Sequence, residues 1–123
     1  MLIDTNIFID HLRGYQPATK YLESLVGKTD ILFSAITETE IIAGKMNNDP
    51  KKREMVLHLL HQWCKVSLGN PVAAFAGDLQ REHGLETPDA IIAATARSTG
   101  AELITRNLKD FQRVPDLRVR APY

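Results

Sequence analysis

Four acidic residues stand where a strand or a helix is expected to begin or end, and carboxylates placed in this way could bind a metal ion. Asp4 directly follows the apolar pair at residues 2–3, which predicts a very short buried strand. Glu40 lies early in an expected helix, and Asp89 and Asp110 lie near the starts of two others. A carboxylate at the end of a buried strand needs a partner, because burying an unpaired charge is costly. Asp4 is therefore the strongest single candidate for a functional residue.

The other three acids each have a local structural explanation. Glu40 follows Thr37 by three residues, which is the spacing of a helix capping box. Asp89 comes after a Thr-Pro pair, a pattern typical of a helix start, where a negative charge is favoured by the helix dipole. Asp110 stands three residues after Asn107 and could belong to a similar cap. Taken one at a time, these three acids indicate helix starts rather than chemistry.

The elements that must position the acids alternate between short strands and helices. Apolar runs predict strands at residues 2–3, 31–33, 65–68, 103–105 and 117–119. Helical spacing and terminating glycines predict helices at residues 7–12, 17–26, 37–43, 51–64, 71–83, 88–98 and 108–111. Such alternation implies crossover connections and a parallel sheet with helices on both faces. We therefore expect a three-layer α/β/α fold with a short, mostly parallel sheet of four or five strands, in a single domain over residues 1–123.

Two further predictions concern the burial of side chains. Residues 51–64 predict an amphipathic helix with Met55, Leu59 and Leu60 on its inner face. The only cysteine, Cys64, stands beside Trp63 in an apolar stretch, so we expect a buried thiol without a catalytic role. A single cysteine also favours a reducing compartment.

The acids become more informative when they are considered together. Sheets of this kind bind ligands beyond the carboxyl ends of their strands, near the switch in strand order. Asp4, Asp89 and the turn from Asn107 to Asp110 could all face that edge. Neighbouring carboxylates raise one another's pKa unless a cation neutralises them. Oxygen ligands without His or Cys suit Mg²⁺ or Mn²⁺, and such an ion beside an open crevice predicts phosphodiester hydrolysis.

Composition and charge place few limits on the partner. Hydrophobic residues make up 44% and charged residues 24% of the chain, which indicates a globular protein rather than a disordered one. Lys and Arg number 15, as do Asp and Glu, so only a local basic patch could indicate a nucleic acid. The apolar run at residues 1–3 ends at Asp4 and is too short for a signal peptide. We expect a cytoplasmic protein that does not enter a membrane.

Four sequence blocks resemble the motifs of PIN-domain proteins, and they are most similar to the VapC toxins of bacterial and archaeal toxin–antitoxin pairs. The blocks are MLIDTNIFID at residues 1–10, S-x-x-T-x-x-E-x-x-x-G at residues 34–44, TPDAIIAATA at residues 87–96 and, after a glycine at position 100, LITRN-x-x-DF at residues 103–111. They occur in the family's order and span almost the whole chain. Together they form a specific signal, although each alone is weak.

The resemblance implies a role for each matching acid. Asp4 and Asp89 match the principal metal ligands, and Glu40 matches the third acidic residue of the site. Many relatives carry a fourth acid two residues after a threonine, where this chain has Asn107. Asp110 is then expected to supply the charge at the metal, directly or through water. The expected cofactor is Mg²⁺, with Mn²⁺ as a substitute, and Asn107 leaves the number of ions open.

Four polar residues are expected to support these acids, and a basic segment is expected to bind RNA. Thr5, Asn6, Thr105 and Asn107 would orient the carboxylates or bond near the metal. The last stretch of the chain is basic, and it is either a solvated face or a surface for RNA phosphates; its first cations are Arg106, Lys109 and Arg113.

The resemblance also implies an activity and partners. It implies an endoribonuclease that cuts single-stranded or structured RNA, often transfer RNA. It further implies a small antitoxin that covers the crevice, and a homodimer.

Three other functions remain open on the sequence. A haloacid-dehalogenase-like phosphatase also has an Asp after its first strand, but it needs a second acid two residues after Asp4, where Asn6 stands. A receiver domain would need paired acids at the first strand and a lysine after a late strand, and neither is evident. A catalytically silent PIN-like RNA-binding module is the third alternative, because of Asn107.

Overall fold

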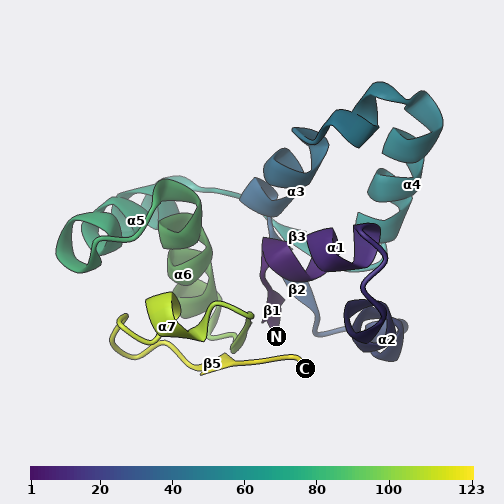
Figure 1. Cartoon of the computed structure of the whole chain (residues 1–123). Coiled ribbons are helices and arrows are strands. Elements are labelled where there is room, and N and C mark those ends of the chain that lie inside the picture. Colours follow the sequence, from purple (N-terminus) through teal and green to yellow (C-terminus); the bar gives the residue numbers. More distant parts are fainter.

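Five parallel strands form the centre of the computed structural model, which describes all residues 1–123 (Figure 1). The strands are β1 (Leu2–Ile3), β2 (Leu32–Ser34), β3 (Cys64–Val66), β4 (Leu103–Ile104) and β5 (Val119–Arg120). Their order in the sheet is β3-β2-β1-β4-β5, and all four neighbouring pairs are parallel. The predicted sheet is confirmed. The switch in strand order lies between β1 and β4, which places a ligand site beyond their carboxyl ends.

Helices cover both faces of this sheet. One layer holds α1 (Thr5–Leu12), α2 (Gln16–Leu25), α3 (Ala35–Ile42) and α4 (Pro50–Leu60), with the 3₁₀ helix η1 (Lys45–Asn48) between the last two. The other layer holds α5 (Asn70–His83), α6 (Thr87–Thr99) and α7 (Leu108–Phe111). Figure 1 shows α3, η1 and α4 as an arm beside the sheet, and α5, α6 and α7 on the opposite side. No helix is both long enough and apolar enough to span a membrane.

Two separate hydrophobic cores confirm the predicted three layers. Successive side chains of a strand point to opposite faces. Leu2 and Leu103 accordingly lie in the core that α5, α6 and α7 build, while Ile3 and Ile104 lie in the core that α1, α2, α3 and α4 build. All four side chains are at most 1% exposed. A strand of only two residues can therefore hold the two layers together, because each residue anchors one of them.

The ends of the strands pass directly into helix caps. Asp4 follows β1 and caps α1 by accepting a hydrogen bond from the amide of Thr5. Ser34 ends β2 and caps α3 by accepting one from the amide of Ile36. Side-chain oxygens at such positions satisfy the free amides of a helix start. The same local rule thus places polar groups at the carboxyl edge of the sheet.

Three local predictions are wrong. Helix α4 ends at Leu60 rather than at residue 64, because the chain turns at Trp63 to begin β3. The buried residues of α4 are Val56 and Leu60, one helical turn apart, whereas Met55 is 66% exposed. Cys64 is exposed, not buried, because it lies on the edge strand β3.

Candidate active site

Asp4 occupies the carboxyl end of β1, next to the switch in strand order. Its side chain is buried, with 2% exposed. Oδ1 accepts a hydrogen bond from the Thr5 amide at 2.8 Å, and Oδ2 accepts one from the Thr105 hydroxyl at 2.7 Å. Burial raises the pKa of Asp4, and these two hydrogen bonds oppose that rise without cancelling it. The two hydrogen bonds therefore fix the orientation of the carboxylate, but they do not compensate for the burial of its negative charge.

Glu40 faces Asp4 from α3 through a pair of threonines. Thr5 Oγ1 donates its hydrogen to Glu40 Oε1 at 2.8 Å. Because a hydroxyl has one hydrogen, Thr37 Oγ1 must be the donor in its hydrogen bond to Thr5 Oγ1 at 2.9 Å. Thr37 is fully buried inside α3. The predicted capping box of Thr37 and Glu40 is wrong, because Ser34 caps the helix and frees Glu40 to bond across to α1.

Asp89 lies in the first turn of α6 and is half-buried. Its pKa is raised to about 6, first by burial and then by the negative charges of Asp4, Glu40 and Asp110, in that order. The helix dipole usually lowers the pKa of an acid at such a position. At Asp89 the effects of burial, first, and of the surrounding negative charges, second, outweigh that of the dipole.

The start of α6 has no side-chain cap. Glu86 holds the cap position and its side chain makes no capping hydrogen bond. Thr87, the first residue of the helix, exchanges hydrogen bonds with Gln80 of α5. Helix α5 ends at Gly84, which has a φ of +66°, a conformation that favours glycine. This turn reverses the chain so that Asp89 approaches the sheet.

The exit from β4 forms the last part of the site. The Thr105 hydroxyl donates to Asp4 and accepts from the Asn107 amide at 2.9 Å. Asn107 Nδ2 donates to Asp110 Oδ2 at 2.8 Å, and Arg113 forms an ion pair with Asp110 at 3.6 Å. Asn107 therefore positions Asp110. Asn6, the remaining expected supporting residue, is half-buried in the first turn of α1.

The acids share one edge of the sheet without forming a finished metal cage. The pKa of Asp89 responds to the charges of Asp4, Glu40 and Asp110, which places all four in one electrostatic site. Yet no three of them come together closely enough to hold an ion in these side-chain positions. The four acids therefore do not converge as tightly as a metal site requires. Glu40 is directed towards Thr5 and Asp110 towards its own turn, as uncompensated like charges favour.

The cations expected to bind RNA differ in their partners. Lys109 is exposed and forms no ion pair, whereas Arg113 pairs with Asp110 in the next turn. Arg106 pairs with Asp10 of α1. Asp10 is not a solvated surface residue, since its side chain is only 14% exposed. Two of the three predicted cations are thus already held by carboxylates.

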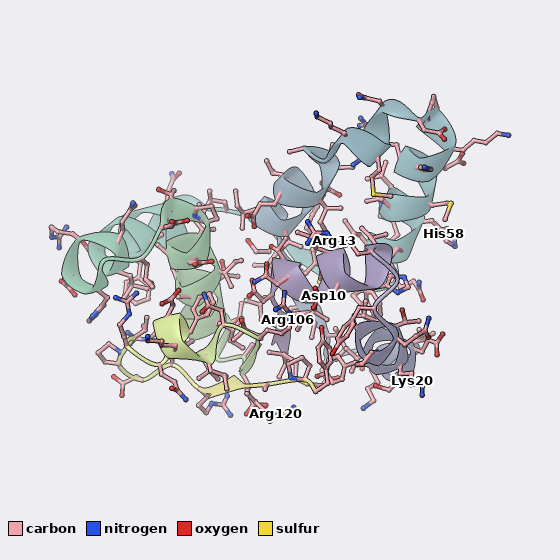
Figure 2. The ribbon with its side chains drawn as sticks, in the orientation of Figure 1. Asp10, Arg13, Lys20, His58, Arg106 and Arg120 are labelled. Atoms are coloured by element: carbon pink, nitrogen blue, oxygen red, sulfur yellow. The ribbon has the colours of Figure 1, made fainter.

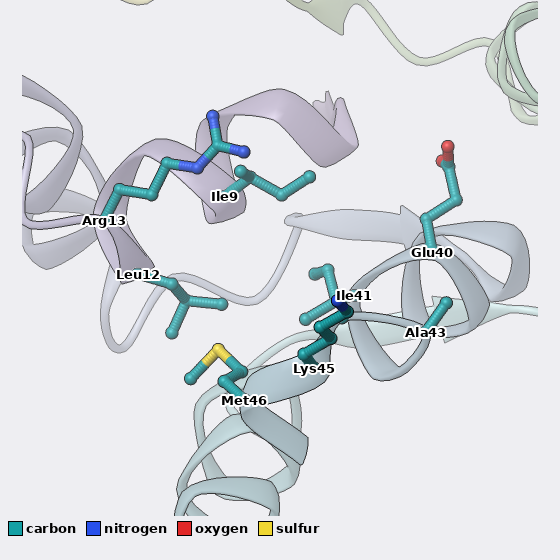
Figure 3. A pocket seen from close by; sticks show the side chains of 9 residues that line it. Ile9, Leu12, Arg13, Glu40, Ile41, Ala43, Lys45 and Met46 are labelled. Atoms are coloured by element: carbon teal, nitrogen blue, oxygen red, sulfur yellow. The ribbon is translucent and has the colours of Figure 1, made fainter. Parts of the chain in front are cut away.

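A groove beside Glu40 separates α1 from α3 and η1. Its volume is about 440 Å³. Figure 3 shows Ile9 and Leu12 of α1 on one wall and Ile41 and Met46 on the other, with Glu40 at one end. The remaining lining residues, two of which are cations without an ion pair, are Arg13, Ala43, Gly44 and Lys45. The groove thus has apolar walls and leads to the acidic site.

Sequence reasoning missed three contributors to this region: Thr37 as a hydrogen-bond donor, Asp10 as an ion-pair partner, and the groove. The spacing of Thr37 to Glu40 predicts a helix cap equally well. The apolar residues of the groove lie at helical spacing and predict core packing equally well. No local signal distinguishes these cases, because each depends on how two helices are placed relative to each other.

Comparison with known proteins identifies close relatives of the chain. The family model described as PIN domain matches residues 1–117. Ribonuclease VapC19 of Mycobacterium tuberculosis is 32% identical over 123 aligned residues, which cover 95% of this chain and 96% of the relative. A solved toxin–antitoxin complex from Klebsiella pneumoniae contains a chain of 34% identity, with a TM-score of 0.83 and coverage of 99% and 97%. A chain of the VapBC-1 structure from nontypeable Haemophilus influenzae is 25% identical, with a TM-score of 0.78 and coverage of 98% of this chain and 96% of that chain.

Proposed function

Because the chain belongs to the PIN-domain family, and within it to the VapC ribonucleases, we propose that it is a Mg²⁺-dependent endoribonuclease that acts as the toxin of a toxin–antitoxin pair. The observation that carries the proposal is the acidic site at the carboxyl ends of β1 and β4. There the pKa of Asp89 is raised to about 6 by burial and by Asp4, Glu40 and Asp110. A site with this excess of negative charge favours a divalent cation.

The donor set suits a hard ion. Asp4, Asp89 and Asp110 offer only carboxylate oxygens, which Mg²⁺ and Mn²⁺ prefer. Asp4 and Asp89 are the principal ligands in this proposal, and Asp110 acts directly or through water. Each oxygen of Asp4 that accepts a hydrogen bond keeps a further lone pair for an ion. When bound, the ion would stabilise charge on the phosphate and strengthen water as a nucleophile.

The chain's own residues orient the reacting groups. Thr5 and Thr105 fix the two oxygens of Asp4, and Thr5 also fixes Glu40. In this proposal Glu40, held at the edge of the crevice, orients a water and accepts its proton while the water oxygen bonds to phosphorus. The P–O bond to the leaving RNA oxygen breaks, and that oxygen takes a proton from solvent. Asn107 holds Asp110 at the opposite side. Preorganised carboxylates avoid the cost of reorienting side chains during the reaction.

The substrate of this proposal is single-stranded or structured RNA, with transfer RNA as one candidate. Lys109 has no ion pair and is free to contact phosphates, while Arg106 and Arg113 border the acids. Phosphate contacts of this kind position the strand rather than select its sequence. The reaction would take place in the cytoplasm.

The partner of this proposal is a cognate antitoxin. The groove between α1 and η1 has apolar walls and ends at Glu40, so a segment that fills it would also cover the acids. An apolar groove beside polar groups is the usual form of a recognition site for a peptide segment. We further propose that the chain acts as a homodimer, as the resemblance of its sequence implies.

An RNA cleavage assay tests the proposed activity. Wild-type protein is expected to cut RNA with Mg²⁺ or Mn²⁺ and to stop when a chelator removes the ion. Asp4→Asn and Asp89→Asn are expected to lose about 100-fold or more in kcat, because each removes a proposed metal ligand. Glu38→Gln is the matched control, since Glu38 pairs with Lys65 outside the site.

Two results would contradict the proposal. Equal cleavage by all four proteins, or cleavage by none, would show that the acids do not catalyse RNA hydrolysis. A stable phosphoaspartyl adduct would instead favour the phosphatase or receiver alternative.

A further inference from the structure

Three distant segments meet at Asp10, outside the acidic site. Asp10 lies on α1, Arg106 follows β4, and Tyr123 lies beyond β5. Arg106 Nη2 donates to Asp10 Oδ1 at 3.2 Å, and Arg106 Nε pairs with Asp10 Oδ2 at 2.5 Å. The Tyr123 hydroxyl donates to the same Oδ2 at 2.7 Å. Figure 2 labels Asp10 and Arg106 next to each other beside α1.

Tyr123 is itself held in place by aromatic contacts. Its ring packs edge-on against Tyr15 at 5.6 Å and against Tyr21 at 6.4 Å between ring centroids. Burial and the hydrogen bond to Asp10 raise the pKa of Tyr123, so its hydroxyl keeps its proton and donates throughout the neutral range. Asp10 is thus a fixed acceptor, with its carboxylate oriented from one side by Tyr123 and from the other by Arg106.

The way in which Asp10 engages Arg106 leaves part of the guanidinium free. A guanidinium has five N–H groups arranged as a fork. Asp10 accepts a hydrogen bond from Nη2 and forms an ion pair on the Nε side, so both hydrogens of Nη1 and the second hydrogen of Nη2 remain free of Asp10. The Arg106 side chain is 47% exposed, so the pair with Asp10 does not bury it. Two parallel N–H donors match the oxygens of a phosphate.

Arg106 lies next to the acidic site. Arg106 directly follows Thr105, whose hydroxyl donates to Asp4. The charge of Arg106 is also close enough to oppose the rise in the pKa of Asp4. Arg106 is therefore paired with Asp10 and is also a neighbour of the crevice where the proposed substrate would lie.

We propose that Asp10 and Tyr123 are positioning residues that hold the guanidinium of Arg106 so that its free edge binds an RNA phosphate next to the acidic site. This inference rests on the proposed ribonuclease function. An arginine that is already held loses less conformational freedom on binding than one that is free in solvent. The opposite role for Asp10, which would be to keep Arg106 away from RNA, predicts the opposite effect of its removal.

The test measures binding and cleavage separately. RNA binding is followed with a single-stranded oligonucleotide in chelator, over a range of salt concentrations, and kcat and KM are measured with Mg²⁺. The variants are Arg106→Gln, Asp10→Asn and Tyr123→Phe, with the double variant of Arg106 and Tyr123. Arg118→Gln is the matched arginine control, because Arg118 bonds to the Gly100 carbonyl at the amino ends of the strands. Thermal melts establish that each variant is folded.

The expected results separate positioning from folding. Arg106→Gln should weaken binding and raise KM about 5- to 10-fold, with kcat within about threefold, and lower the slope of log K against log salt by about 0.7. Asp10→Asn and Tyr123→Phe should each raise KM about two- to threefold, because both loosen Arg106 without removing its charge. The double variant should bind no more weakly than Arg106→Gln alone, since Tyr123 acts only through Arg106.

Several outcomes would overturn the inference. A slope of log K against log salt that is unchanged in Arg106→Gln would show that Arg106 does not contact a phosphate. Tighter binding by Asp10→Asn would show that Asp10 withholds Arg106 from RNA. A Tyr123→Phe effect that persists in full without Arg106 would show that Tyr123 acts independently. These results leave cleavage by the wild type intact, whereas a wild type that binds RNA but does not cut it contradicts the proposed function instead.

Discussion

The Thr105 hydroxyl donates a hydrogen bond to Asp4 Oδ2 at 2.7 Å, across 101 positions of the sequence. The bond joins the exits of β1 and β4, the two strands that flank the switch in strand order. It also leaves the hydroxyl oxygen to accept from the Asn107 amide. One threonine therefore connects the proposed metal ligand with the turn that carries Asp110.

Replacing Thr105 with Val should lower the stability of the protein. The change keeps the shape of the side chain but leaves the buried Asp4 carboxylate without one donor, at a cost of about 1–3 kcal/mol in the free energy of unfolding at pH 7. Urea denaturation measures this cost. Thr105→Ser keeps the hydroxyl and should retain most of the wild-type stability. Equal stability of Thr105→Val and wild type would show that the bond does not hold Asp4.

Asp89 should make the metal-free protein less stable as the pH rises. Its pKa is raised to about 6 in the folded state, so between pH 4 and 6 the folded protein binds a proton that the unfolded chain has lost. The free energy of unfolding therefore falls through this window. Asp89→Asn removes the penalty and should be more stable than wild type at pH 7.5, by on the order of 1 kcal/mol after allowance for solvent screening.

Denaturation in chelator from pH 3.5 to 8 tests this dependence. The difference in stability between the two proteins should shrink towards pH 3.5, where Asp89 is mostly protonated in both states of the wild type. An Asp89→Asn variant that is less stable than wild type at pH 7.5 would contradict the electrostatic interpretation.

The two threonines beside Glu40 should differ in importance. Thr5 donates directly to Glu40, whereas Thr37 donates only to Thr5. Thr5→Val should therefore lower kcat about tenfold or more, and Thr37→Val should lower it about two- to threefold. Single-turnover cleavage of RNA at saturating enzyme measures both. A larger loss for Thr37→Val than for Thr5→Val would reverse the proposed order of the bonds.

The groove beside Glu40 should matter for the antitoxin and not for cleavage. Met46→Gln removes an apolar wall residue and should weaken binding of the cognate antitoxin about fivefold or more, with RNA cleavage unchanged within about twofold. Met55→Gln is the matched control, because Met55 is 66% exposed and lies outside the groove. Calorimetric titration with the antitoxin compares the three proteins. Equal affinities of the three proteins for the antitoxin would show that the antitoxin does not bind in this groove.

The sheet and the placement of Asp4 were predictable because local rules determine them. Two apolar residues followed by Asp and a helical pattern predict a buried strand that ends in a helix cap, and residues 2–4 do this. The proline-led start of α6 likewise fixes Asp89 in a first turn. Parallel pairing then brings the exits of β1 and β4 to the same edge, as expected for alternating strands and helices.

The partners of the site residues were not predictable, because they depend on packing between distant elements. Glu40 meets Thr5 across 35 positions, and Arg106 meets Asp10 across 96. Nothing near Asp10 in the sequence distinguishes it from a solvated helix residue. The phase of α4 is a similar case, since Met55 and Val56 are both apolar and only packing into the core on this face of the sheet decides that Val56 is buried.

The central claim is that Asp4 and Asp89, with their acidic neighbours, bind a divalent cation, and thermal unfolding with and without Mg²⁺ or Mn²⁺ tests it most directly. Wild type should be stabilised by about 2.7 kcal/mol at an ion concentration 100 times the dissociation constant, while Asp4→Asn and Asp89→Asn should gain little and Glu38→Gln should behave as wild type. The same stabilisation in all four proteins, or none in wild type, would contradict the claim.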